Sequence, residues 1–202
     1  MSFNFLIGIL ITVCIAIYVT IYLVGLFRGY VKPVLATWLF LSFATILSFI
    51  MDFRETGMHG VFSNLFNVVD MVAVASVFII ILFRKDTRRT FNTFEKICLG
   101  VVLVIFVGWL ISGQNIIAHL AIQGILVVAY LPMLVQLWNA KVNTESLGTW
   151  SFDCAASVFG LIIPIATHDF LPTVYGVRSV LSTIAVIALI LRLKYKNKTI
   201  AS

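Results

Sequence analysis

The chain has 202 residues, of which 61% are hydrophobic and only 11% are charged. A soluble domain carries roughly a quarter charged residues, so this composition excludes a water-exposed globular surface. The apolar residues fall in long runs, and a helix of about 20 apolar residues crosses the hydrocarbon core of a bilayer. Lipid offers no partners to unpaired backbone groups, and no segment has the period-two alternation of a transmembrane barrel. The sequence therefore predicts an all-α, multi-pass membrane protein.

Seven runs are long and apolar enough to be drawn as transmembrane helices. In chain order they are Phe3–Leu26, Pro33–Met51, Val61–Phe83, Lys96–Ser112, Ile116–Trp138, Trp150–Thr167 and Thr173–Leu193. The links between them are short, and the longest is Arg84–Glu95. No link is long enough to separate two soluble domains.

The basic residues lie almost entirely on alternate links. Twelve of the 14 Lys and Arg residues fall on the first, third and fifth links and the C-terminal tail. The opposite side holds Arg54, and Arg178 lies within a span. The positive-inside rule therefore predicts an outer N-terminus and a cytoplasmic C-terminus in the plasma membrane (cell inner membrane). The net charge of +6 is attributed to orientation and to anionic lipid head groups, with no nucleic-acid partner.

The first and fifth spans begin segments that resemble each other. Each contains Tyr-Leu, then a polar turn, then Thr-Trp, then small residues at every third position. The matched residues are Tyr22-Leu23 with Tyr130-Leu131, Thr37-Trp38 with Thr149-Trp150, and Ser42, Thr45 and Ser48 with Cys154, Ser157 and Gly160. This pattern predicts an internal repeat, a feature common in membrane transporters.

The third helices of the two segments also match. Asp70 precedes Arg84 by fourteen residues, and Arg178 precedes Arg192 by fourteen. The prediction is a 3+1+3 arrangement of seven transmembrane helices: residues 1–83 form a first three-helix repeat, residues 84–114 a cytoplasmic loop and linker helix, and residues 115–202 a second repeat with a cytoplasmic tail. Such parallel repeats are related by an axis along the membrane normal and bind ligands between the halves.

The second segment resembles the PQ-loop motif of the SWEET sugar facilitators and their relatives. Pro132 is followed by Gln136, then Lys141, then Thr144-Glu145-Ser146 before the next helix. The first segment, with Lys32-Pro33 ahead of Thr37-Trp38, is similar to uncharacterised bacterial PQ-loop-like membrane proteins. The resemblance covers most of the chain and implies the 3+1+3 fold and a small polar solute as partner.

The chain departs from that family at two points. The Pro-Gln pair itself is absent, because Pro132-Met133 and Val24-Gly25 stand in its place. Where SWEET pockets carry a matched pair of asparagines on the third helix of each half, this chain has Asp70 and Arg178. Sugar specificity is therefore not carried over.

Several polar residues inside the spans are candidate substrate-binding residues. Asp70 lies about 20 Å from the cytoplasmic end of its helix, within the hydrocarbon region, where an ionisable residue should face the protein interior. It either pairs with Arg178 or lines a cavity with it. The candidate residues are Asn64, Asn67, Asp70, Arg178, His119 and Gln123. His119 and Gln123 share one helix face, and the alternative to a substrate-binding role for them is a hydrogen bond between helices.

Trp38 and Trp150 fall near the cytoplasmic interface. Tryptophans there are most often aromatic-belt anchors, and the alternative is that these two form an inner gate. Pro132 is the candidate hinge. No nucleophile motif, metal-ligand spacing or phosphate loop is present, so neither an enzyme nor a cofactor is expected. Two functions stay open: a facilitator for a small polar solute, and a non-transporting receptor or assembly protein on the same fold. A homo-oligomer is also left open.

Overall fold

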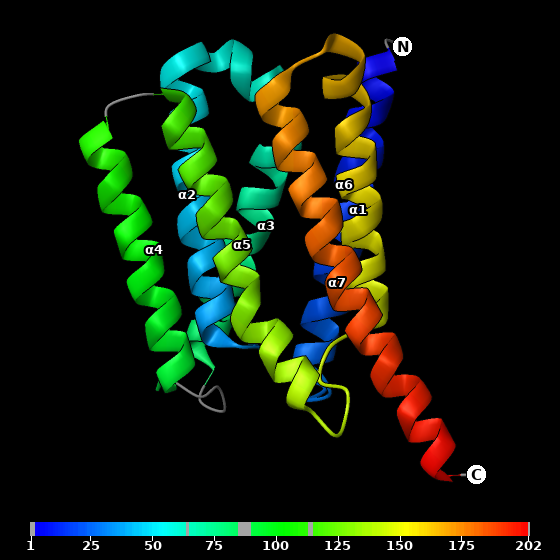
Figure 1. Cartoon of the computed structure of the whole chain (residues 1–202). Coiled ribbons are helices and arrows are strands. Elements are labelled where there is room, and N and C mark those ends of the chain that lie inside the picture. Colours follow the sequence, from blue (N-terminus) through cyan, green and yellow to red (C-terminus); the bar gives the residue numbers. More distant parts are fainter. Residues whose placement is uncertain (1–2, 64, 85–89, 113–114, 202) are drawn as a thin grey trace.

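The computed structural model describes residues 3–63, 65–84, 90–112 and 115–201, and the regular structure in these ranges is α-helical (Figure 1). The helices are α1 (Phe3–Phe27), α2 (Leu35–Ser63), α3 (Leu65–Phe83), α4 (Thr93–Ser112), α5 (Asn115–Asn139), α6 (Leu147–Thr167) and α7 (Phe170–Ala201). Six of the described helices are long and apolar enough to cross a membrane, and the apolar part of α2 is the shorter stretch Leu35–Met51. The all-α prediction is thereby confirmed for the described residues, and the six apolar helices are compatible with a multi-pass membrane protein.

Two helices run further than hydropathy predicted. The link expected between Met51 and Val61 is helical, so that α2 continues to Ser63 and its cyan end lies across the top of the bundle in Figure 1. At the other end, α7 continues past Leu193 to Ala201. Hydropathy marks where a helix leaves the apolar layer, whereas helical hydrogen bonds are made by the backbone and persist into polar sequence.

Local capping explains where two of the helices begin. Before α4, the Asn92 Oδ1 accepts from the Glu95 amide at 2.7 Å, and the Glu95 carboxylate accepts from the Asn92 amide at 2.7 Å. This reciprocal pair is a capping box. At the start of α6, Ser146 Oγ accepts from the Thr149 amide at 3.3 Å. The amides of a helix's first turn lack intrahelical partners, and these side chains supply them.

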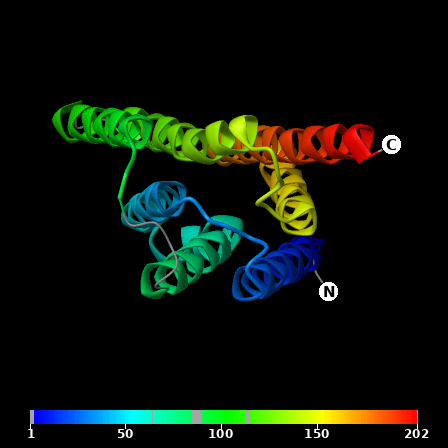
Figure 2. The ribbon, with the colours of Figure 1, turned by 90° about the horizontal axis from the view of Figure 1, so that it is seen from below.

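Six helices form a closed ring, in which each packs on the next in the order α1, α3, α2, α5, α7, α6 and back to α1. The remaining helix, α4, lies outside the ring against α5 and, to a smaller extent, α2. Figure 2 shows this from below: α4, α5 and α7 lie in a row on one side, α2, α3 and α1 lie on the other, and α6 lies between α7 and α1. The interior of the bundle is therefore lined by every helix except α4.

The small residues of α2 and α6 lie at helix contacts. On α2, Ser48 Oγ accepts from Asn67 Nδ2 of α3 at 2.9 Å. On α6, Ser157 Oγ and Ser179 Oγ of α7 are 2.8 Å apart, and a Cβ on Gly160 would come within 2.9 Å of the Phe66 ring. Small residues allow close helix approach, and their hydroxyls hydrogen-bond across helices.

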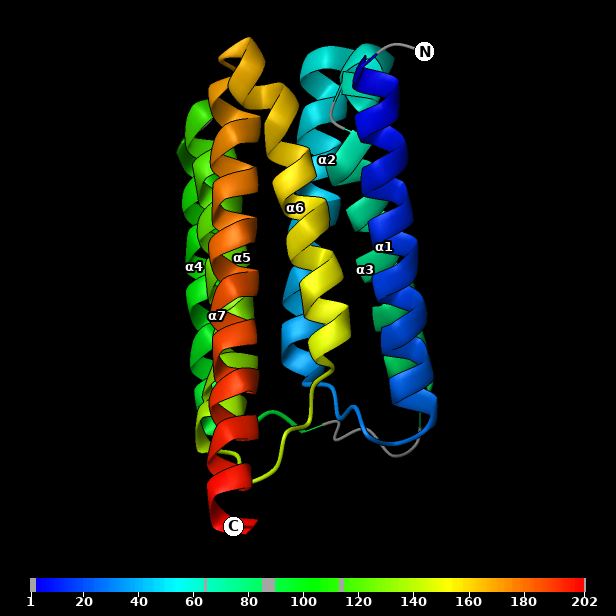
Figure 3. The same cartoon turned by 90° about the vertical axis from the view of Figure 1, so that its right-hand side faces the viewer.

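The upper and lower ends of the bundle carry different chain termini and different connections between helices. The N-terminus lies at the upper end and the C-terminus at the lower end in Figure 3. The lower end also carries the connections from α1 to α2 and from α5 to α6. Because consecutive helices alternate in direction, α1, α3, α5 and α7 all run downward in Figure 1.

Candidate functional site

A small polar cavity lies at the centre of the six-helix ring. Its free volume is about 20 Å³, room for about one water molecule. The lining residues come from all six ring helices: Tyr18 of α1; Trp38, Leu41 and Thr45 of α2; Asp70 and Val74 of α3; Leu126 and Tyr130 of α5; Thr149, Trp150 and Asp153 of α6; and Arg178 and Ser179 of α7. The cavity therefore lies between segments from both ends of the chain.

Asp70 is held in this cavity by two tyrosines. Its Oδ1 accepts from the Tyr18 hydroxyl at 3.2 Å, and its Oδ2 accepts from the Tyr175 hydroxyl at 3.0 Å. The first donor lies on α1 and the second on α7. Both carboxylate oxygens therefore have neutral donors, and the carboxylate joins helices that are far apart in the sequence.

Arg178 lines the same cavity as Asp70 but forms no direct ion pair with it. Its Nε donates to Gln123 Oε1 at 3.0 Å, and its guanidinium lies over the Tyr175 ring, 4.8 Å from the ring centroid. The expected direct pairing of Asp70 with Arg178 is thus wrong, because tyrosine hydroxyls occupy the carboxylate and a glutamine and an aromatic face hold the guanidinium. The alternative of a shared cavity describes their arrangement.

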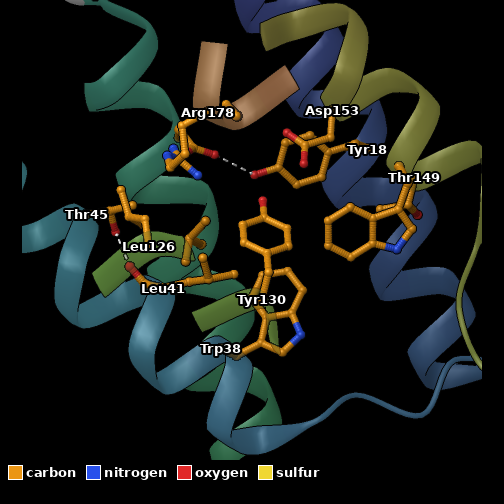
Figure 4. Close-up of a pocket in the computed structure, with 13 residues that line it drawn as sticks. Tyr18, Trp38, Leu41, Thr45, Leu126, Tyr130, Thr149, Asp153 and Arg178 are labelled. Carbon is orange, nitrogen blue, oxygen red and sulfur yellow. Dashed lines mark hydrogen bonds between the residues drawn. The ribbon is translucent and has the colours of Figure 1, made fainter. Parts of the chain in front are cut away.

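A second carboxyl, Asp153, enters the cavity from α6. It is 9% exposed, and within the described chain its side chain has neither a hydrogen-bond partner nor an ion pair. Figure 4 shows its carboxyl directed into the space that Arg178 and the hydroxyls of Tyr18 and Tyr130 also face. Its charged neighbours in the lining are Asp70, which repels it, and Arg178, which attracts it. A buried carboxyl without a hydrogen-bond partner is costly, so Asp153 differs from Asp70, whose two oxygens are both hydrogen-bonded.

Two aromatic pairs close the lower side of the cavity. The rings of Tyr22 and Trp38 have centroids 4.8 Å apart, and those of Tyr130 and Trp150 have centroids 6.1 Å apart. Both tryptophans are 3% exposed. The interpretation of Trp38 and Trp150 as aromatic-belt anchors is therefore wrong: sequence position placed them near a helix end, but their helix faces turn them into the bundle.

The indole N–H groups of the two tryptophans have different acceptors. Trp38 Nε1 donates to the Tyr22 hydroxyl at 2.9 Å, whereas Trp150 Nε1 donates to Glu145 Oε2 at 3.0 Å. Glu145 precedes α6 and is 3% exposed. Its other oxygen, Oε1, is buried without a hydrogen-bond partner in the described structure. Burial raises the pKa of Glu145 to about 8, and the Trp150 hydrogen bond opposes that rise.

The connections at the lower end are hydrogen-bonded to each other. The Lys32 amide donates to the Thr144 carbonyl at 3.0 Å. Gln136 Nε2 lies 3.3 Å from both the Lys32 carbonyl and Thr144 Oγ1. One turn earlier, Pro132 lies inside α5, where it cannot donate the backbone hydrogen bond of a regular helix. The α1–α2 and α5–α6 connections are thus joined below the cavity.

The other predicted site residues lie elsewhere. Asn64 falls outside the described residues. Asn67 is 1% exposed and bridges α3 to α2 through Ser48, so it is a helix contact away from the cavity lining. His119 lies with Gln123 beside a second small cavity near the upper end, which Ser48 and Tyr175 also line. Two of its lining residues also contact the central site: Gln123 accepts from Arg178, and Tyr175 donates to Asp70.

Sequence reasoning missed Asp153 and the tyrosines of the site. The signal for Asp153 was available, since Asp70 and Asp153 are the two acidic residues inside the predicted spans. Tyr18 and Tyr175 gave no such signal, because tyrosine is ordinary in a membrane helix. Tyr130 was matched to Tyr22 in the repeat but was not assigned to the site. The role of these tyrosines depends on ring contacts between helices that are distant in sequence.

The chain matches no protein-family model, no curated protein and no solved structure.

Proposed function

We propose that the chain is a seven-span carrier for a small polar solute, working by alternating access between two three-helix halves of SWEET or PQ-loop type. In this proposal α1–α3 form the first half, α4 is the linker, α5–α7 form the second half, and the lower end is cytoplasmic. The twelve-to-one distribution of basic residues supports that orientation.

The helix contacts support the division into halves. In the first half α3 packs against both α1 and α2, which are not neighbours; in the second half α7 packs against both α5 and α6, which are not neighbours either. Between the halves, α1 packs on α6 and α2 packs on α5. An exchange of the two halves leaves these six contacts unchanged, as a two-fold axis along the membrane normal requires; of the contacts between the halves, the small one between α3 and α6 is the one without a counterpart among the described helices.

The central cavity is the observation that carries the proposal. It lies between the halves, takes lining residues from three helices of each, and contains two carboxyls and a guanidinium. Ionisable groups at this depth are costly in a membrane protein and mark solute or ion pathways. A purely structural core could be apolar at these positions with no loss of stability.

The closed lower end supports alternating access in place of an open channel. The cavity is too small for a solute, and the Trp38 and Trp150 pairs and the hydrogen bonds of Gln136 close its lower side. A solute could enter only if the halves separated at one end. In this mechanism the tryptophans form the inner gate, and Pro132 is the hinge at which α5 bends.

The test is an uptake screen in proteoliposomes with radiolabelled neutral sugars, amino acids, amines and carboxylates. We expect saturable uptake of one class by the wild-type chain, and loss of that uptake in Asp70→Asn. Asp169→Asn is the matched control, since this exposed residue at the upper end is far from the cavity. Absence of uptake in every class would favour the non-transporting receptor or assembly protein. Equal uptake by the wild type and Asp70→Asn would show that Asp70 takes no part in solute transport.

A further inference from the structure

We propose that the central cavity binds one small alkali cation between the Asp153 carboxylate and the Tyr130 hydroxyl oxygen. This inference rests on the proposed carrier function in one respect: the ion would be the coupling ion of transport. Its binding to the protein is a separate property that can be measured without any solute.

The charges of the cavity favour a monovalent cation. Asp70, Asp153 and Arg178 are the acidic and basic residues of the lining. When both carboxyls are ionised, they and the single guanidinium leave one negative charge in excess. In a medium of low dielectric an uncompensated charge is strongly unfavourable. One bound monovalent cation makes the cavity neutral.

The hydrogen bonds direct that cation to Asp153. Both oxygens of Asp70 already accept from tyrosine hydroxyls, and Arg178 is held by Gln123 and the Tyr175 ring. Asp153, which is 9% exposed, has no such partner among the described residues. Figure 4 shows the Tyr130 hydroxyl directed toward the space between Arg178 and Asp153. Its oxygen interacts with the Arg178 guanidinium on one side and faces the Asp153 carboxylate on the other.

The size of the cavity favours an ion over the solute itself. A free volume of about 20 Å³ accepts a guest about as large as a water molecule, which a dehydrated alkali ion can match. The ligands are carboxylate and hydroxyl oxygens, which suit hard cations. Within the described chain no group of three His, Cys, Asp or Glu residues forms a transition-metal site. Coupling ions of secondary carriers bind near the midplane between the repeats, as this ion would.

The experiment measures binding of radiolabelled Na⁺ to the purified full chain in detergent, with choline replacing Na⁺ at constant ionic strength. We expect saturable binding that unlabelled Na⁺ displaces and choline does not. Asp153→Asn should weaken it by roughly tenfold or more because the charge is lost, and Tyr130→Phe should weaken it by several-fold. Asp169→Asn should bind as the wild type does. Size-exclusion profiles identify any variant that fails to fold, and Tyr130→Phe keeps the test available if Asp153→Asn does.

Several results would overturn the proposal: no difference between Na⁺ and choline, a response to pH alone without alkali-ion binding, or equal Na⁺ binding by the wild type and both folded variants. The outcome is also separable from that of the carrier proposal. Solute uptake without Na⁺ binding would remove the ion site and leave the carrier, whereas Na⁺ binding without uptake of any solute would leave the ion site and remove the carrier.

Discussion

Ionisation of Glu145 should make the stability of this protein fall as the pH rises. The carboxyl is 3% exposed at the lower end of the bundle, and its single hydrogen bond is to the Trp150 indole. Its pKa is about 8 in the folded chain, against an ordinary value of 4.5. Between these two values the folded chain binds more protons than the unfolded chain, so the free energy of unfolding decreases with increasing pH.

The magnitude follows from the pKa difference. Below about pH 4.5 both states are protonated and the contribution is fully present, and above about pH 8 it is fully lost. Each pKa unit corresponds to roughly 1.4 kcal/mol, so the free energy of unfolding should fall by about 4 kcal/mol between about pH 5 and pH 8. Glu145→Gln should remove this slope, because the amide cannot ionise and its oxygen can still accept from Trp150.

The assay is SDS-driven unfolding of the purified protein in detergent micelles, followed by tryptophan fluorescence across that pH range. Asp169→Asn, which changes an exposed carboxyl at the opposite end, should keep the wild-type slope. If Glu145→Gln and the wild type lose stability equally with pH, then Glu145 is not the titrating group and the argument from its burial is refuted.

Three further predictions follow from the contacts. Trp150→Phe leaves the buried Glu145 carboxyl without its hydrogen-bond donor and should lower the free energy of unfolding by about 1–3 kcal/mol. Trp38→Phe leaves only the neutral Tyr22 hydroxyl without a donor and should lower it by about 1 kcal/mol. Equal losses in the same SDS titration would contradict the assigned partners. Gly160→Ala places a Cβ 2.9 Å from the buried Phe66 ring and should cost about 1–3 kcal/mol, while Gly124→Ala, whose nearest neighbour would be 3.7 Å away, should not destabilise the chain. In a background without the native cysteines, an impermeant thiol reagent applied to intact cells should label Asp169→Cys and leave Val142→Cys unlabelled, and the reverse result would invert the predicted orientation.

The sequence by itself determined the class of protein and the alternation of its helices. Long apolar runs can be stable only as membrane helices or a buried core, and a chain with 11% charged residues has too few polar groups for the latter to be covered. The sequence also indicated that Asp70 and Arg178 would face the interior, because the bilayer penalises charge regardless of the details of packing. Both conclusions need only the composition of the sequence and the depth of a residue along its helix.

Helix ends and side-chain partners were decided by the tertiary structure. Hydropathy ended the second span near Met51, but the backbone hydrogen bonding of α2 continues to Ser63. Depth placed Asp70 and Arg178 together, yet the hydroxyls of Tyr18 and Tyr175 take the carboxylate and Gln123 takes the guanidinium. These partners lie on helices remote in sequence, and their meeting depends on the rotation of each helix about its axis.

Asp153 shows most clearly what the sequence determines and what the tertiary structure decides. In the sequence, Asp153 stands three residues after Trp150, near the start of the predicted span Trp150–Thr167. The structure turns that face of α6 inward, so that the carboxyl lines the central cavity at 9% exposure. Sequence gives the depth of a residue along a helix, but which way the residue faces is fixed by packing against neighbouring helices. That rotation, set by the contacts of α6 with α1 and α7, is what assembles two carboxyls and a guanidinium into one site.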